Sequence, residues 1–326
     1  MAVGLSPLLR LAGGLVSPGG RRGRLSILIY HRVLPEPDPM RPHEIDAATF
    51  HWQMAALRGH FTVLPLTEAV ERLAAGGLPP RAAAITFDDG YADNVDIALP
   101  ILQGLGLSAT FFIATGFLNG GRMWNDSIIE ALRIAPGARA DLTALGLGEH
   151  DIGDMAKRHA TAAALIGKLK YLPVLARGAA VERLTATLGV RLPDDLMMTD
   201  AGVNRLHRAG MGIGGHTVNH PILAGTDPAD VRREIAVGRE YLEGLLGERV
   251  ALFAYPNGRP HQDYRAEHVK LVKALGFRAA VSTAWGAARP GADCFQLPRF
   301  TPWDRSPARF IARLLLNVRH APNAAV

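Results

Sequence analysis

The stretch AAAITFDDGY at residues 82–91 runs from apolar residues directly into two adjacent carboxylates and a glycine. Its first six residues have the length and apolar content of a buried strand, and Asp88-Asp89-Gly90 has the composition of the turn that ends it. Adjacent residues of a regular strand point to opposite faces. Asp88 and Asp89 are therefore expected in different surroundings, where one carboxylate can bind a cation while the other stays a base.

The same alternation of a short apolar run with a longer helix-periodic segment extends outward from this stretch. It predicts strands at residues 25–30, 61–66, 82–87, 108–114, 211–215, 251–255 and 278–283. It predicts helices at residues 48–58, 67–75, 94–103, 228–246, 267–274 and 307–318. Strands that alternate with helices in one chain form a parallel sheet. The sequence therefore predicts an α/β fold, and seven such strands favour a closed or nearly closed barrel over a small open sheet.

Residues 124 to about 209 interrupt this alternation, because they contain helical runs but no convincing strand. We expect them to form a helical insertion on the C-terminal face of the barrel, where loops carry specificity. The main domain would span residues 25–320, with a tail at 321–326.

Residues 1–24 form a basic arm with four arginines and no acidic residue. The arm fits neither a secretory signal nor a spanning helix, so the protein is expected to be cytoplasmic or peripheral at the inner membrane surface. Two interpretations stay open, a frayed terminus and a segment that contacts an anionic membrane surface.

Composition excludes several classes of function. The formal charge of +6 includes +4 from the arm, which leaves +2 for the rest of the 326 residues. No basic stripe with interleaved aromatic residues follows, so nucleic acid is not an expected partner. The single cysteine, Cys294, excludes an internal disulfide and a cysteine-rich zinc site. Any metal must be held by histidine and carboxylate.

Polar residues follow three more of the expected strands, and barrel active sites form at such C-terminal strand ends. Strand 25–30 is followed by His31, strand 251–255 by Pro256 and Asn257, and strand 211–215 by His216 and His220. The last two are four residues apart, a spacing that places both imidazoles on one side of a helical turn. With one carboxylate they form a common donor set for catalytic zinc, and cobalt or nickel accepts the same ligands.

The string Thr86-Phe87-Asp88-Asp89-Gly90-Tyr91, followed by His216-Thr217-Val218-Asn219-His220, resembles the first two motifs of the polysaccharide deacetylase family. This is the NodB-homology domain, or carbohydrate esterase family 4, and the resemblance covers roughly Leu25 to Phe300. It implies a distorted (β/α)7-8 barrel. It also implies an enzyme that uses one divalent metal ion, usually zinc, to remove acetyl groups from the N-acetylhexosamine residues of a polysaccharide. Residues 29–33 resemble the exopolysaccharide and poly-N-acetylglucosamine branch.

The resemblance also implies residue roles. Asp89, His216 and His220 correspond to the metal ligands and Asp88 to the catalytic base. The backbone N–H of Tyr91 would stabilise the oxyanion of the tetrahedral intermediate.

Two departures from the family pattern affect the catalytic residues. Residues 253–258 are similar to the third motif, in which Tyr255, Pro256 and Asn257 would line the groove, but its usual arginine is missing. Arg299 is expected either to replace it and orient Asp88 or to form an ordinary ion pair. The usual C-terminal Leu-x-His motif also has no match. His31 is therefore the candidate general acid, with a supporting role beneath the site as the alternative.

Three further residues are candidates for binding substrate. Trp124 and Asp126 open the insertion together with Asn125, so that Trp124 would stack on a sugar ring. Asp126 is alternatively a helix N-cap. Trp285 would form part of the acetyl pocket or fill the core.

Two functions other than polysaccharide deacetylation stay open. The same site would serve a deacylase of a lipid-linked sugar or a small amide. A catalytically inactive carbohydrate-binding homologue would keep the fold alone.

Overall fold

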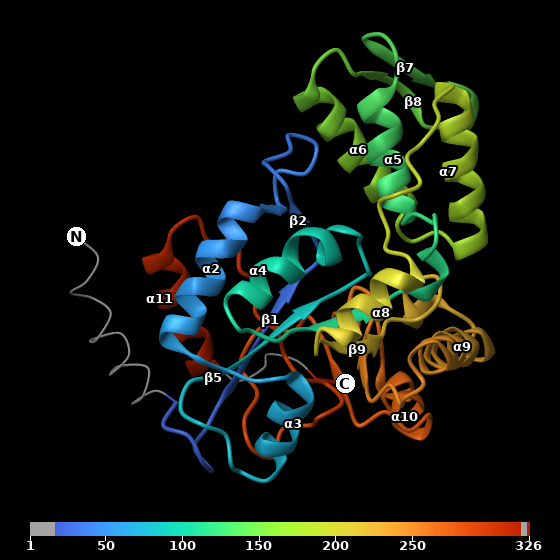
Figure 1. The fold of residues 1–326 in the computed structure, drawn as a ribbon. Coiled ribbons are helices and arrows are strands. Elements are labelled where there is room, and N and C mark those ends of the chain that lie inside the picture. Colours follow the sequence, from blue (N-terminus) through green and yellow to red (C-terminus); the bar gives the residue numbers. More distant parts are fainter. Residues whose placement is uncertain (1–16, 321–324) are drawn as a thin grey trace.

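The computed structural model describes residues 17–320 and 325–326. These residues form a body, in which helices surround one sheet, and a helical lobe on one side of that body (Figure 1). Residues 1–16 of the expected basic arm lie outside the described part. The remainder of the arm packs on the body, since Ser17 is buried and the N–H of Gly20 donates to the carbonyl of Leu78 over 2.7 Å.

A single parallel sheet of seven strands forms the centre of the body. The order is β1-β5-β6-β9-β10-β11, and β4 pairs with the start of β5. The strands are β1 (Leu25–Tyr30), β4 (Thr62–Val63), β5 (Ala82–Phe87), β6 (Thr110–Ile113), β9 (Gly212–Gly215), β10 (Leu252–Ala254) and β11 (Ala279–Val281). Each lies within one of the seven expected runs.

The segment 297–300 joins the two edges of this sheet. The N–H of Leu297 donates to the carbonyl of Ala280 in β11 over 3.0 Å, and the N–H of Phe300 donates to that of Ile27 in β1 over 2.7 Å. The sheet therefore curls into a distorted barrel, which confirms the predicted fold class.

Helices form at all six places where the sequence predicts them. Those of the body are α2 (Ala47–His60), α3 (Leu66–Ala74), α4 (Leu99–Gly104), α8 (Asp200–Arg208), α9 (Pro228–Leu246), α10 (Ala266–Ala274) and α11 (Pro307–Arg319). A π-helical turn, η1 (Asn94–Ala98), precedes α4, and 3-10 turns form at η2 (Thr115–Phe117) and η4 (Leu223–Gly225).

Local signals define several helix ends. The Asp46 carboxylate accepts a hydrogen bond from the N–H of Thr49 over 2.7 Å and caps α2. α9 begins with Asp227 as cap and Pro228 at its first position, and Gly247 ends it with a φ of 70°.

The two faces of the sheet are packed differently. The face toward the barrel interior carries mostly small side chains such as Ala82, Ala84 and Ala254, and α3 packs against them. The other face carries large side chains such as Phe87 and Phe111, which pack against the surrounding helices. Because side chains alternate along a strand, the same face of β5 leads from Ala82 and Ala84 to Asp88 at its end.

The lobe corresponds to the expected insertion and has its own hydrophobic core. Its elements are α5 (Trp124–Ile134), β7 (Arg139–Leu142), η3 (Thr143–Leu145), β8 (Gly148–Asp151), α6 (Met155–Leu169) and α7 (Val174–Leu188). The expectation that it lacks strands is wrong, because β7 and β8 form an antiparallel hairpin. Only Ala140 and Leu142 of this hairpin are buried, so its sequence lacks an apolar run. α8, placed by the sequence in the insertion, packs against α9 and β9 of the body.

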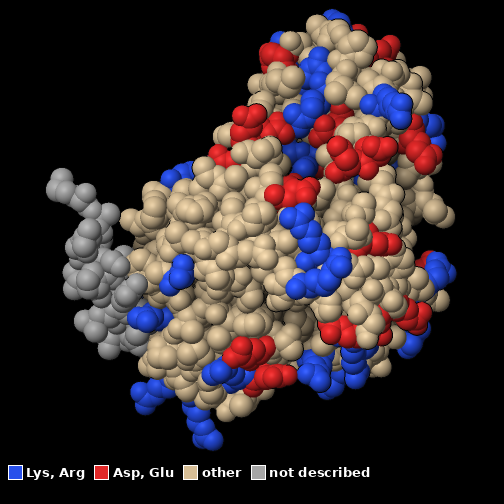
Figure 2. Space-filling model, in the orientation of Figure 1, with Lys and Arg blue, Asp and Glu red and all other residues tan. Residues whose placement is uncertain are grey.

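A short segment between β1 and α2 lies between body and lobe. It contains β2 (Val33–Leu34) and β3 (Ile45–Asp46), which pair in parallel. Acidic and basic side chains are interspersed over the face shown in Figure 2. Among the described helices, none is long and apolar enough to cross a membrane.

We expect Gly214→Ala to destabilise the protein. A methyl group at Gly214 of β9 would overlap the ring of Phe112 and lie 3.0 Å from the carbonyl oxygen of Leu252. Overpacking of this kind costs roughly 1–3 kcal/mol of unfolding free energy, which denaturant titration can measure. The control is Gly244→Ala in α9, where the methyl group meets no atom within 4 Å and should be neutral or stabilising. Equal stability of the two variants would contradict this packing.

Candidate functional site

A cavity of about 380 Å³ opens between the C-terminal rim of the barrel and the lobe. Body residues that line it include His31, Asp88, Asp89, Tyr91, His216, His220, Asn257 and Thr283. The structure therefore places in one cavity the residues that the sequence predicts on one rim of the barrel.

Asp89, His216 and His220 form a group that could hold a metal ion. Oδ1 of Asp89 lies 3.4 Å from Nε2 of His216 and 3.5 Å from Nε2 of His220. Ligand atoms around a tetrahedral zinc ion lie about 3.4 Å apart, given metal–ligand distances of roughly 2.1 Å. The same Oδ1 is buried and accepts no hydrogen bond from any described residue. The three residues therefore fit a divalent cation.

The backbone around these ligands is held in unusual conformations. φ is positive at Asp89 (77°), Thr217 (65°) and His220 (51°), which is rare for residues other than glycine. The hydroxyl of Thr217 accepts a hydrogen bond from the N–H of His220 over 3.1 Å. The Glu234 carboxylate of α9 accepts hydrogen bonds from the N–H groups of Val218 and Asn219 over 3.0 and 2.7 Å. These contacts fix the loop that carries the histidines, and no sequence motif indicated Glu234.

The histidines are prepared to act as ligands. Nδ1 of His216 lies 2.8 Å from the carbonyl oxygen of Ala254, so its proton is held there and Nε2 faces Asp89. Burial lowers the pKa of His220 to about 4 and favours the neutral ring. Burial also disfavours the charged form of His216, but the carboxylates of Asp88 and Asp89 outweigh it and raise the pKa of that ring. Burial raises the pKa of Asp89, but His216, His220 and His31 outweigh it and lower that pKa.

Asp88 is bound by Arg299 through two hydrogen bonds of 2.7 Å, one to each carboxylate oxygen. The side chains are 3% and 0% exposed, so the pair is shielded from water. Burial raises the pKa of Asp88, but the charge of Arg299 outweighs it and the net shift is downward. Arg299 also donates to the carbonyl of Ser282 over 2.9 Å. This arrangement orients an ionised carboxylate beside the metal-ligand group, as the first of the two expectations for Arg299 requires.

His31 and Tyr91 lie at the same cavity. The side chain of His31 is exposed on the rim, and its carbonyl accepts a hydrogen bond from Asn94 over 2.9 Å. The Tyr91 ring is buried beneath Arg32 at 4.7 Å. No described residue accepts a hydrogen bond from the backbone N–H of Tyr91, which leaves this donor free for a substrate oxygen.

Three of the expected substrate contacts are not supported by the geometry. Within the described chain, Tyr255, Pro256 and Trp285 do not line this cavity. Tyr255 is fully buried and stacks on Tyr264 with ring centroids 4.0 Å apart. Trp285 packs on His320 at 4.5 Å. Tyr255 therefore fills the core, and the half-buried Trp285 packs against its edge.

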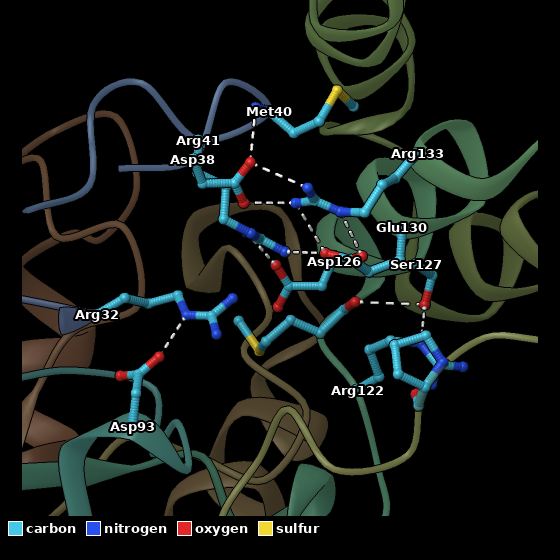
Figure 3. A network of polar contacts seen from close by, with 12 residues as sticks. Arg32, Asp38, Met40, Arg41, Asp93, Arg122, Asp126, Ser127, Glu130 and Arg133 are labelled. Carbon is cyan, nitrogen blue, oxygen red and sulfur yellow. Dashed lines mark hydrogen bonds and ion pairs between the residues drawn. The ribbon is translucent and has the colours of Figure 1, made fainter. Parts of the chain in front are cut away.

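Asp126 is neither a helix cap nor a cavity residue. It is fully buried in the first turn of α5, where its carboxylate lies 2.7 Å from Nη1 of Arg41. Nη2 of Arg41 also contacts Glu130 at 2.9 Å (Figure 3). Arg133 of α5 pairs with Asp38 at 2.6 Å. These ion pairs fasten the segment before β3 to the lobe.

The lobe contributes the second wall of the cavity. Trp124 and Asn125 line it as expected, together with residues that no motif indicated, namely Arg41, His43, Glu44, Met123, Ile129, His159, Ile166, Lys170 and Arg177. Most of them come from the segment before β3 and from α5 to α7. Nothing in the local sequence shows that these segments meet, so sequence reasoning missed them.

Comparison with known proteins places this geometry in a family. The chain is 22% identical over 277 residues to the putative polysaccharide deacetylase YxkH of Bacillus subtilis, covering 85% of this chain and 70% of that protein. Its fold is similar to that of the Streptococcus pyogenes deacetylase PplD, solved in complex with acetate, with a TM-score of 0.61, 19% identity and coverage of 89% and 98%. It is also similar to IcaB from Ammonifex degensii, with a TM-score of 0.59, 19% identity and coverage of 91% and 97%.

The family model for polysaccharide deacetylase matches residues 75–280, which is more than half of the chain and includes Asp88, Asp89, His216 and His220. The agreement between this match and the rim geometry shows that the chain belongs to the polysaccharide deacetylase family.

Proposed function

We propose that the protein is a metal-dependent hydrolase that removes acetyl groups from N-acetylhexosamine residues of a polysaccharide. The observation that carries the proposal is an ionised, buried carboxylate, Asp88, beside a three-residue group that fits a divalent cation. Asp89, His216 and His220 would hold the ion, with zinc as the first choice and cobalt or nickel as alternatives. When bound, the ion would polarise the acetyl carbonyl and lower the pKa of water.

The residues of the chain supply the remaining chemistry. Asp88 takes the proton from the attacking water, and the two hydrogen bonds from Arg299 keep its carboxylate charged and oriented. The free backbone N–H of Tyr91 donates to the oxygen that develops negative charge. His31 protonates the departing amine from the exposed side of the rim. The products are acetate and the free amino sugar.

The substrate class follows from the family and from the cavity. An exopolysaccharide or cell-wall polymer agrees with the family match, and Trp124 offers an aromatic surface for a sugar ring. The retained Asp88, Asp89, His216 and His220 argue against an inactive carbohydrate-binding homologue.

We expect the metal-loaded protein to release acetate from N-acetylglucosamine oligosaccharides and to lose this activity with a chelator. Asp88→Asn should abolish turnover and retain the metal, because Asp88 is assigned to proton transfer. Asp89→Asn should lose both, because Asp89 is assigned to ligation. Acetate assay and metal analysis of each variant measure the two properties.

The matched control is Asp96→Asn, since Asp96 is an exposed carboxylate on η1 outside the cavity. It should behave like the wild type. If Asp88→Asn loses the metal while Asp89→Asn keeps it, the two roles are reversed. If no acetylated saccharide releases acetate in the presence of zinc, cobalt or nickel, the proposed activity is wrong.

His31→Ala should lower kcat for an N-acetylated sugar by about 10²–10⁴-fold, the typical contribution of a general acid. An aryl acetate has a good leaving group that needs no proton, so its hydrolysis should change much less. The metal content should stay the same. His51→Ala on the exposed face of α2 is the control. Equal losses on both substrates would show that His31 supports the site without donating a proton.

Arg299→Met should lower the unfolding free energy by roughly 3–5 kcal/mol, because it leaves the carboxylate of Asp88 buried without a partner. Asp88→Asn should restore part of this loss in the double variant, since it removes the unpaired charge. Denaturant titration of the four proteins in this cycle gives the coupling. Additive effects would argue that the ion pair does not stabilise the charge on Asp88.

A further inference from the structure

We propose that Arg177 and Lys170 of the lobe bind an anionic group, phosphoryl or carboxylate, attached to the N-acetylated sugar. The proposal rests on the proposed function for the acetyl group, whereas the binding of the anion rests on the lobe residues alone. If it holds, the protein prefers a saccharide that carries a negative charge over a neutral N-acetylated polymer.

Arg177 differs from every other buried arginine of the described chain. Five arginines are buried, and four of them have a carboxylate oxygen 2.7 Å away. The four pairs are Arg32–Asp93, Arg41–Asp126, Arg239–Glu243 and Arg299–Asp88. Arg177 is 4% exposed, yet no described carboxylate lies within ion-pair distance of it. A buried charge is costly unless it is paired, so the missing partner is expected to come from outside the chain.

The guanidinium of Arg177 is held in place by its neighbours, but most of its N–H donors have no acceptor among the described residues. It lies over the Trp124 ring at 4.7 Å and donates one hydrogen bond, to the carbonyl of Lys170 over 3.2 Å. A guanidinium has five N–H donors, so most of them have no acceptor among the described residues. Burial without a countercharge lowers its pKa. The planar group therefore faces the cavity with donors that suit a phosphoryl or carboxylate group.

Lys170 adds a second positive charge at the same wall. It follows α6 and lines the cavity, and no described carboxylate forms an ion pair with it. The next residue, Tyr171, accepts a hydrogen bond from Gln262 of the body over 3.0 Å, which holds the turn between α6 and α7 at the rim. The imidazoles of His43 and His159, 6.4 Å apart, add polar groups to the lining.

The three acidic residues that line the cavity are not partners of Arg177. Asp88 is paired with Arg299, and Asp89 belongs to the metal-ligand group. Glu44, on the segment before β3, interacts electrostatically with His31, Arg32 and Arg41. A ligand that places its acetyl group at the metal-ligand residues can thus direct an anionic group toward Arg177 and Lys170.

The test compares binding of N-acetylglucosamine 1-phosphate and N-acetylglucosamine by isothermal titration calorimetry. Metal-loaded Asp88→Asn is the host, so that the ligand is not hydrolysed. The anionic sugar should bind at least about tenfold more tightly than the neutral sugar. Arg177→Gln should weaken binding of the anionic sugar by about 10–100-fold, the effect of losing a charged hydrogen bond. Lys170→Gln should cause a smaller loss. Binding of the neutral sugar should stay the same in both variants.

A disaccharide of N-acetylglucosamine and a uronic acid, measured in parallel, separates a carboxylate ligand from a phosphoryl ligand. Tighter binding of either anionic sugar, lost in Arg177→Gln, supports the proposal. The control is Arg183→Gln, which removes an exposed arginine from the same helix. Equal affinities for neutral and anionic sugars in the host, or equal losses on both in Arg177→Gln, would overturn it.

Stability separates the proposal from a structural role of Arg177. Removal of an unpaired buried cation should leave the thermal midpoint of Arg177→Gln unchanged or higher. A large fall in the midpoint would show that the contact with Trp124 is structural, and the partly exposed Lys170 would then decide the question through its own variant. Anion binding without acetate release from any saccharide would refute the proposed function and leave this inference standing.

Discussion

The buried ion pair between Asp88 and Arg299 links the architecture of the barrel to its chemistry. Arg299 lies on the segment 297–300, which hydrogen-bonds to both edges of the sheet and closes it. Its guanidinium crosses the barrel interior to Asp88 at the end of β5. A carboxylate at this depth would otherwise be neutral, because desolvation favours the protonated form. Barrel closure thus delivers the cation that keeps the base charged, and the small side chains of the interior leave room for it.

The metal-ligand residues depend on a second constraint, the conformation of two short loops. Left-handed backbone at Asp89, Thr217 and His220 shapes the loops that bring the ligand atoms together, at a cost of about 1–3 kcal/mol for each residue. The Glu234 carboxylate offsets this cost through hydrogen bonds to the loop. α9 therefore acts on the site from outside the barrel. This support holds the three donors at spacings suited to a cation.

The lobe forms the cavity together with the body, and under the proposed function its side chains would distinguish one substrate from another. Ion pairs of Arg41 and Arg133 fix the lobe to the segment that also carries His43 and Glu44 (Figure 3). Because these pairs are largely buried, the two walls are held at a defined separation. Under the proposed function, acetyl removal would take place in the body, and the lobe would select the rest of the substrate.

The sequence by itself determined the elements and the centre of the site. Strand and helix periods are local properties, so the seven strands and six helices were predictable, as was the rim that gathers Asp88, Asp89, His216 and His220. The absence of the third motif's arginine also led to Arg299 as a candidate replacement, although its contact with Asp88 depends on how the barrel closes.

Only the tertiary structure decided the residues whose role depends on what packs against them. Asp126 is a buried partner of Arg41, Tyr255 fills the core, the half-buried Trp285 packs on His320, and a largely exposed hairpin belongs to the lobe. The sequence also could not predict that Arg177 has no carboxylate partner among the described residues. A helical arginine has the same local sequence whether or not a carboxylate from another segment reaches it, and long-range packing alone settles that.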